Sequence, residues 1–122
     1  MKEVKAYIRH HMVNRVIEAL EGAGFTDMTL IDVQRIAKGV STPEDRYSLE
    51  LAEKYMDVLR LELVCRDLEA ATVVDIIERT ARTGRRGDGL IAVSPVETVV
   101  RISTGERGDT ALRPDAGRES EG

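Results

Sequence analysis

The segment MDVLRLELVC, residues 56–65, alternates apolar and charged side chains with the clearest period of two in the chain. A period of two is the repeat of a β-strand, whose side chains point to opposite faces. One face of this predicted strand carries Leu59, Leu61, Leu63 and Cys65. The opposite face carries Arg60 and Glu62, together with Val58 and Val64. The strand therefore belongs to a sheet with one face on the core and one face that is either hydrated or paired.

Two segments have the spacing of amphipathic helices. The first ends at Gly24, a residue that favours a helix C-terminus. Its apolar face consists of Val13, Val16, Ile17 and Leu20. The second begins at Asp67, a good N-cap residue, and ends near residues 83–84. Its apolar stripe consists of Ala70, Val73, Val74, Ile77 and Ala81.

Three more strands are predicted around these helices. Residues 4–8 (VKAYI) form a short first strand, and residues 28–36 (MTLIDVQRI) form the next one. After the second helix come LIAVS, a break at Pro95 and the alternating segment VETVVRIS (96–103). We predict that this last segment is the final strand.

The order of these elements predicts an α+β fold. Strand, helix, strand, long connection, strand, helix, strand is the order of a ferredoxin-like βαββαβ sandwich, with two helices on one face of an antiparallel sheet. The uncovered face carries Val58 and Val64 beside charged residues, which is too apolar a mixture to be wholly solvated. We therefore expect a homo-oligomer in which these faces pack together.

Composition excludes several classes of function. The 122 residues suffice for one domain with a modest core. With 18 Lys and Arg against 22 Asp and Glu, the net charge of -4 favours neither nucleic acid nor an anionic membrane as partner. No apolar run is long enough for a membrane span, so we expect a cytoplasmic protein. The single cysteine, Cys65, can form no internal disulfide and is predicted to be a buried hydrophobe.

Two stretches are too polar to contribute to the core. Residues 37–55 form a connection longer than ordinary loops, so they are either functional or mobile, and Thr42-Pro43 can start a short helix within them. From Thr104 onward there is almost no apolar residue. We predict one domain over residues 1–108 and a polar, disordered tail over residues 109–122.

The segment RTARTGRRGDGLIAV, residues 79–93, combines glycines with arginines. A glycine-rich turn allows backbone N–H groups to converge on an anion, and the neighbouring Arg82, Arg85 and Arg86 add positive charge. We expect a ligand to sit against the backbone of residues 87–89, so that a bulky residue in place of Gly89 would block the ligand without disturbing the core. The alternative is a turn whose arginines are solvated and partly paired with the surplus acids.

Residues 80–108, TARTGRRGDGLIAVSPVETVVRISTGERG, resemble the C-terminal signature of the PII signal-transduction (nitrogen regulatory protein P-II) family. That signature is a T-G-x-x-G-D-G turn, an apolar strand and an R-x-x-T-G-E segment. The similarity continues through residues 18–30 and 59–65, and residues 37–54 fall where the family has its long T-loop. Residues 47–55, 61–67 and 93–97 look closest to a divergent PII-like branch, sometimes encoded beside heavy-metal efflux pumps.

The resemblance implies a regulator rather than an enzyme. PII proteins are homotrimers of ferredoxin-like subunits that bind adenine nucleotides in the clefts between subunits and engage a target protein through the T-loop. The ligand would be ADP, AMP or ATP, and a membrane transporter is one candidate target. Carried over residue by residue, the cleft comprises Met28, Thr29, Ile36, Ala37, Lys38, Glu62, Leu63, Val64 and Arg101, with Gly87, Asp88 and Gly89 from the neighbouring chain. Arg101, on the predicted last strand, would meet the phosphates.

Several positions depart from the family pattern. Leu90 stands where the family has a lysine and Ser103 where it has an arginine, so two phosphate partners are missing. We therefore expect ADP or AMP to bind at least as well as ATP. Glu62 loses its family partner, the lysine, and Arg60 can substitute. Gly39 replaces a glutamine that coordinates magnesium, which argues against a magnesium and 2-oxoglutarate site.

Two other functions stay open. A metal-responsive protein would use His10 and His11, with the acids Glu44 and Asp45 of the long loop. Adjacent residues on an extended segment point in opposite directions, however, and two ligands make a poor site, so we predict no metal site. A weak ATPase would use Glu62 and Asp88 as an acid and base, but no spacing supplies a nucleophile. We favour the nucleotide-binding regulator.

Overall fold

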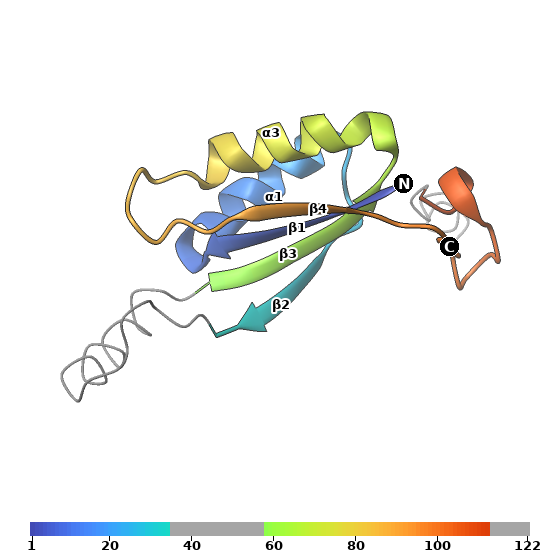
Figure 1. Cartoon of the computed structure of the whole chain (residues 1–122), viewed down its shortest axis with the longest axis horizontal. Coiled ribbons are helices and arrows are strands. Elements are labelled where there is room, and N and C mark those ends of the chain that lie inside the picture. The colour runs from blue at the N-terminus through green and yellow to red at the C-terminus, as the bar shows by residue number, and fades with distance from the viewer. Residues whose placement is uncertain (35–57, 113–122) are drawn as a thin grey trace.

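The chain folds into a four-stranded antiparallel sheet with two helices on one face (Figure 1). The computed structural model describes residues 1–34 and 58–112. The strands are β1 (Lys2–Arg9), β2 (Thr29–Val33), β3 (Val58–Cys65) and β4 (Ile91–Pro95). The α-helices are α1 (Val13–Gly22) and α3 (Ala70–Ala81), and the short 3₁₀ helices are η1 (His10–Met12), η2 (Asp67–Glu69) and η3 (Gly108–Leu112).

The strand order is β2-β3-β1-β4, and every neighbouring pair is antiparallel. β1 and β3 therefore lie in the centre of the sheet, with Ala6 opposite Leu61 and Tyr7 opposite Arg60. This is the order of a ferredoxin-like sandwich, and it confirms the predicted α+β fold class. The two N-terminal strands differ in length from the prediction, since β1 reaches from Lys2 to Arg9 and β2 ends at Val33.

The prediction of a final strand over residues 96–103 is wrong. The fourth strand of the sheet is the LIAVS segment, and its pairing with β1 ends where Pro95 lies opposite Lys2. The next residues fold back on themselves instead: Val100 forms an isolated bridge with Arg107, and the N–H of Arg101 donates to the carbonyl of Glu106 at 2.9 Å. Ile102 is 98% exposed. The segment has run past the end of β1, so β1 has no residue left for it to pair with.

The core lies between the helices and the covered face of the sheet. From β1 and β3 it takes Val4, Ala6, Ile8, Leu61, Leu63 and Cys65, and from the helices Val13, Val16, Leu20, Val73, Ile76 and Ile77. The predicted helix faces are confirmed, apart from Ile76, which the predicted stripe omitted. Cys65 is buried as predicted, and that burial raises the pKa of its thiol. Val58, predicted to lie on the uncovered face, is buried as well.

The ends of the helices test two capping predictions. Gly24 follows α1 with a φ of +95°, and the N–H of Phe25 donates to the carbonyl of Leu20 at 2.9 Å, which confirms the predicted helix end. The N-cap prediction for Asp67 is wrong. Asp67 is already inside η2, and its Oδ1 accepts a hydrogen bond from the Met1 ammonium at 2.7 Å. This contact between distant residues holds the carboxylate away from the helix backbone.

The predicted boundary at residue 108 falls on the first residue of η3, and Ala111 of this turn is buried. The predicted T-loop and the tail beyond Leu112 lie outside the described residues, as do the predicted site residues Ile36, Ala37 and Lys38. Within the described ranges, no helix is long and apolar enough to cross a membrane.

Candidate ligand site

A cavity of about 500 Å³ opens where β2 and β3 pair and the segment after β4 crosses them. Thr29 of β2 lies opposite Glu62 of β3, and both line the cavity. The segment that continues from β4, orange to red in Figure 1, supplies residues 99–103 and the end of η3. Five predicted site residues meet here: Thr29, Glu62, Leu63, Val64 and Arg101. Met28 is not among the lining residues, because its half-buried side chain packs against the core.

The sequence predicted that Arg101 lies on a strand. Instead, its side chain is held by contacts with Ala111 and Asp27. Its Nε donates to the carbonyl oxygen of Ala111 at 3.0 Å, and its Nη1 donates to Oδ2 of Asp27 at 2.8 Å. The side chain of Arg101 is 20% exposed, whereas that of Asp27 is 64% exposed. The cation in the cavity therefore already has an acidic partner, and that partner faces solvent.

Three carboxylates share the cavity with Arg101: those of Glu3, Asp27 and Glu62. Oε1 of Glu62 lies 2.9 Å from Nε of Arg60, the pairing expected from the sequence. Hydrogen bonding to Tyr7 and the charge of Glu62 raise the pKa of Arg60. The contact with Glu62 is poorly aligned, and Nε of Arg60 is buried with no hydrogen-bond acceptor among the described residues. The cavity walls are thus more acidic than basic.

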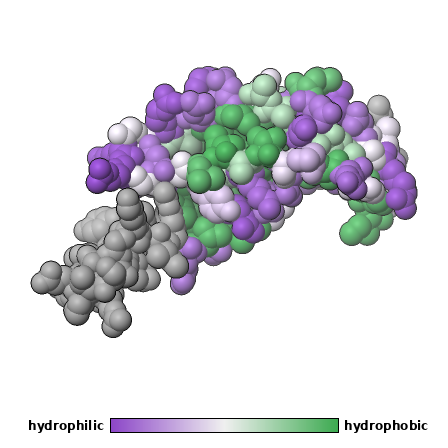
Figure 2. Space-filling model, viewed as in Figure 1, coloured by the Kyte–Doolittle hydropathy of each residue, from purple (hydrophilic) through white to green (hydrophobic). Residues whose placement is uncertain are grey.

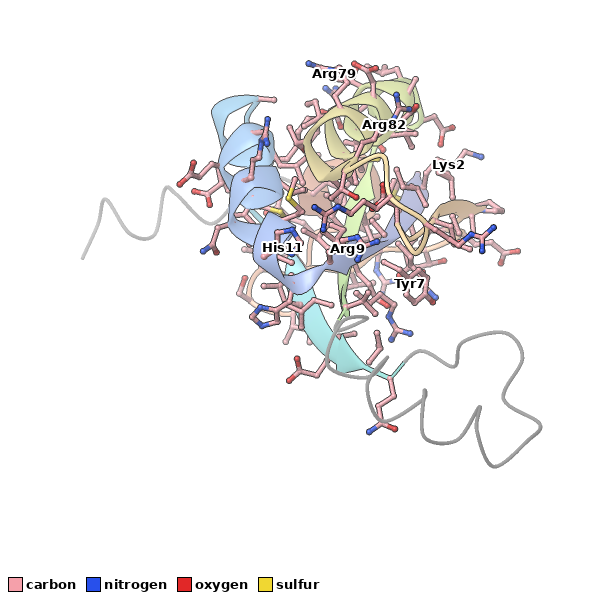
Figure 3. All side chains as sticks on the ribbon, turned by 90° about the vertical axis from the view of Figure 1, so that its left-hand side faces the viewer. Lys2, Tyr7, Arg9, His11, Arg79 and Arg82 are labelled. Carbon is pink, nitrogen blue, oxygen red and sulfur yellow. The ribbon has the colours of Figure 1, made fainter. Side chains whose placement is uncertain are left out.

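The glycine-rich turn after α3 is organised by the carboxylate of Asp88. It accepts hydrogen bonds from the backbone N–H groups of Thr83 and Gly84 at 2.9 and 3.0 Å, and from the Thr83 hydroxyl. Nε of Arg9 donates to it at 2.8 Å, and Nη2 of Arg9 donates to the carbonyl of Arg86 at 2.8 Å. In Figure 3, Arg9 lies beside this turn. Its guanidinium, followed by the Thr83 bonds, holds the pKa of Asp88 far below the ordinary range.

The side chain of Asp88 is therefore committed to shaping the turn. The backbone N–H of Asp88 is also engaged, because it donates to the carbonyl of Arg85 at 3.2 Å. Gly84 and Gly87 have φ values of +79° and +99°, which only glycine adopts readily. Among the arginines, Arg82 pairs with Glu78 on the last turns of α3, which supports the idea that some are neutralised by acids.

The role predicted for Gly89 needs correction. A Cβ at this position would lie 1.7 Å from the carbonyl oxygen of Tyr7 and 2.6 Å from its carbonyl carbon. The glycine is required by the approach of β1, and a bulky residue would push the turn off the sheet. The backbone N–H of Tyr7 also donates to the carbonyl of Leu90 at 2.9 Å, which fastens the turn to the central strand.

The two halves of the predicted site lie apart within one chain. Asp88 and Gly89 line a hollow of about 200 Å³ between α3, β1 and β4, whereas Arg101 lines the cavity of about 500 Å³. The sequence prediction assigned residues 87–89 to a neighbouring chain, and the separation is consistent with that assignment. Sequence reasoning missed Asp27 and Arg9, because neither belongs to a periodic pattern or a motif.

The histidines do not gather into a metal site. His10 and His11 are both exposed on η1, and Figure 3 shows His11 on the side of the molecule where α1 lies. In residues 1–34 and 58–112, no three His, Cys, Asp or Glu side chains are placed to hold a metal ion.

A family model described as nitrogen regulatory protein P-II matches residues 1–106. The chain belongs to the P-II family. Curated relatives agree: the nitrogen regulatory protein P-II of Microchaete diplosiphon is 39% identical over 92% of this chain and 100% of its own length. The nitrogen regulatory protein P-II 2 of Methanothermobacter thermautotrophicus is 37% identical over 92% of this chain and 97% of its own length. The resemblance seen in residues 80–108 is confirmed.

A solved structure extends the similarity to the fold of this P-II protein. The crystal structure of Arabidopsis thaliana PII bound to citrate matches with a TM-score of 0.74 and 31% identity. The match covers 93% of this chain and 90% of the Arabidopsis chain. The βαββαβ arrangement described above is therefore the fold of a known P-II structure.

Proposed function

We propose that this P-II protein is a cytoplasmic signalling protein that binds ADP, AMP or ATP in clefts between the subunits of a homotrimer. Membership of a family named for nitrogen regulation supports a regulatory role. Residues 37–54 contact a partner protein, and the class of partner implied by the sequence resemblance is a membrane transporter. Occupancy of the cleft biases the conformation of these residues and so controls the partner.

The observation that carries this proposal is the separation of the two half-sites. Arg101 and the backbone around Glu62–Val64 line one cavity, while the turn of residues 87–89 is fastened to β1 elsewhere. A ligand that contacts both half-sites must bridge two copies of the chain. A trimer supplies three equivalent bridges of this kind, because each interface joins the cavity of one subunit to the turn of the next.

The chemistry of both half-sites supports an anionic ligand with an apolar end. A guanidinium recognises phosphate or carboxylate oxygens, and a glycine-rich turn presents backbone N–H groups. The half-buried Val64 supplies an apolar side chain of the kind that an adenine ring needs, whereas the side chain of Leu63 packs in the core behind it. The Arabidopsis relative was crystallised with citrate, a small polyanion.

Two measurements test the proposal together. Light scattering after gel filtration should give the mass of a trimer, and calorimetric titration should give one adenine nucleotide per subunit. ADP and AMP should bind at least as tightly as ATP, since Leu90 and Ser103 add no cation. Arg101→Gln should weaken ADP binding at least tenfold, whereas Arg79→Gln, which breaks an exposed pair with Asp75 on α3, should leave it unchanged. A monomer, or no binding of any of the three nucleotides, would contradict the proposal.

A subunit-mixing experiment tests whether the cleft lies between chains. Arg101→Gln removes the cavity cation, and Gly87→Ala disturbs the turn at a φ of +99°. Each variant alone should bind ADP poorly. Mixed trimers of the two variants should regain about a quarter of the clefts, because random assortment places an intact cavity beside an intact turn that often. Absence of any recovery in verified mixed trimers would place the site within a single chain.

A further inference from the structure

Asp27 forms an ion pair with Arg101, the cation on which the proposed phosphate site depends. The Nη1 of Arg101 lies 2.8 Å from Oδ2 of Asp27, a direct, charge-assisted hydrogen bond. The other side of the guanidinium is fixed, because its Nε donates to the carbonyl of the buried Ala111. A phosphate that reaches Arg101 from the cavity must therefore share or displace the Asp27 carboxylate.

The two contacts of Arg101 differ in how readily they can be exchanged. The carbonyl of Ala111 belongs to η3, which packs against the rest of the molecule through a buried side chain. Asp27 lies in the connection between α1 and β2, and its side chain is largely exposed to solvent. Water can solvate the displaced carboxylate, so the exchange of Asp27 for a ligand anion costs little.

The surrounding charges make the exchange dependent on the ligand's charge. Glu3 and Glu62 line the same cavity but already have cationic neighbours, Lys5 at 3.4 Å and Arg60 at 2.9 Å, so a displaced Asp27 adds an uncompensated carboxylate beside the incoming anion. Each additional phosphate charge meets more repulsion, while Arg101 offers only one guanidinium. The cost thus rises with the number of phosphates and is absent for an uncharged nucleoside.

We propose that Asp27 is a specificity-determining residue, which competes with the ligand's phosphates for Arg101 and so favours adenine ligands of low charge. This inference rests on the proposed function of the cleft. It attributes the predicted lack of preference for ATP to a carboxylate on the α1–β2 connection as well as to Leu90 and Ser103.

The test is calorimetric titration of adenosine, AMP, ADP and ATP into the wild-type protein and into Asp27→Asn, at a fixed ionic strength of about 0.15 M. Asp27→Asn should raise the affinity for ADP about threefold to tenfold, with a larger gain for ATP and a smaller one for AMP. Adenosine should bind both proteins equally. The matched control is Asp75→Asn, which removes a carboxylate paired with an arginine at 2.9 Å on the exposed side of α3.

A double-mutant cycle with Arg101→Gln isolates the competition. In the Arg101→Gln background, Asp27→Asn should bring a gain of less than twofold for ADP, since there is no guanidinium left to release. The inference is overturned if the gain survives in that background, if Asp75→Asn gives the same gain, or if adenosine gains as much as ADP. A loss of ADP affinity in Asp27→Asn would overturn it as well, because it would show that Asp27 orients Arg101 for the ligand.

The proposed function and this inference fail in different ways. If neither the wild-type protein nor Asp27→Asn binds any adenine ligand, the proposed function is wrong. If the wild-type protein binds ADP and Asp27→Asn leaves the affinities for ADP and ATP unchanged, only the role of Asp27 is wrong. Circular dichroism melting of each variant verifies that the comparison is made between folded proteins.

Discussion

Two arginine–aspartate pairs hold the two halves of the candidate site, and they differ in almost everything except their chemistry. Arg9 and Asp88 are 12% and 25% exposed, and the Asp88 carboxylate also accepts bonds from Thr83 and Gly84. Arg101 is 20% exposed, but its partner Asp27 is 64% exposed and belongs to an exposed connection. The first pair stabilises a turn, and the second leaves its cation exchangeable.

The difference teaches that an ion pair acquires its role from what surrounds it. A carboxylate with several donors inside a folded turn cannot leave without stranding all of them, which is costly. A carboxylate with one arginine and ample water can leave at little cost. The identity of the two residues in a pair therefore says less than their exposure and their other partners.

The largest effect is expected where the turn touches β1. Gly89→Val should destabilise the fold by about 3 kcal/mol or more, because its Cβ would collide with the Tyr7 carbonyl. Urea denaturation at fixed protein concentration measures this. Gly22→Ala at the end of α1 is the control, since nothing lies within 4 Å of its added methyl group and it should be neutral or slightly stabilising. A fully stable Gly89→Val would mean that the turn is not fastened to the sheet.

Removing the charge of the half-buried Arg9–Asp88 pair comes next. Asp88→Asn should cost about 2 kcal/mol of unfolding free energy, because Arg9 loses its anion and the Thr83 and Gly84 N–H groups lose a charged acceptor. Urea unfolding is again the measurement, with Asp75→Asn on exposed α3 expected to stay within about 0.5 kcal/mol. Equal effects of the two substitutions would show that the additional hydrogen bonds of Asp88 do not stabilise the fold more than an exposed ion pair does.

Acid should reduce the advantage that Asp88 gives. Its pKa in the folded protein is depressed, so its stabilising effect is full above the ordinary aspartate pKa of about 3.9 and is lost as the pH falls toward the folded value. The difference in unfolding free energy between wild type and Asp88→Asn should be constant from pH 7 to 5 and should narrow below about pH 4. The pKa values of Asp67 and Glu69 are also lowered, but both variants retain them, so they cancel. A gap that widens in acid would contradict the assignment.

The smallest effect on stability is expected at the exchangeable pair. Asp27→Asn should change the free energy of unfolding by less than about 0.5 kcal/mol, since the pair is solvent-exposed on the carboxylate side. Thermal and urea unfolding of this variant beside Asp88→Asn measure the contrast directly. A loss comparable to that of Asp88→Asn would show that Asp27 is needed to hold the connection between α1 and β2.

The sheet could be predicted from sequence where the pattern and its partners lie in one chain. The alternation of residues 56–65 identified β3 and the buried Leu61, Leu63 and Cys65, because a central strand must present one face to the core, although it placed the buried Val58 on the wrong face. The same alternation in residues 96–103 led to a wrong strand. A period of two shows that a segment can form a strand, but it does not show whether a partner strand is available. β1 already pairs with β3 and β4, so residues 96–103 cannot pair with it.

The site was predicted in part for a similar reason. Glu62 and Arg101 line one cavity, but Arg101 does not lie on the predicted strand, and its acidic partner Asp27 is distant in the chain. Gly89 shows this most clearly, because the sequence suggests a close approach at this position, while the group that makes the approach, the Tyr7 carbonyl, is visible only in the structure. Figure 2 shows hydrophobic side chains gathered at the end of the molecule where the segment after β4 lies, and the exposed Val100 and Ile102 belong to that segment.

The attachment of the glycine-rich turn to the central strand β1 affects the entropy of ligand binding. Since Tyr7 N–H and the Asp88 carboxylate already fix the backbone there, a ligand in the proposed cleft would meet a surface that needs no ordering. In the proposed cleft, the conformational entropy lost at this half-site should be slight, and the temperature dependence of association should report the other half, where Asp27 yields Arg101 to the ligand and is itself hydrated.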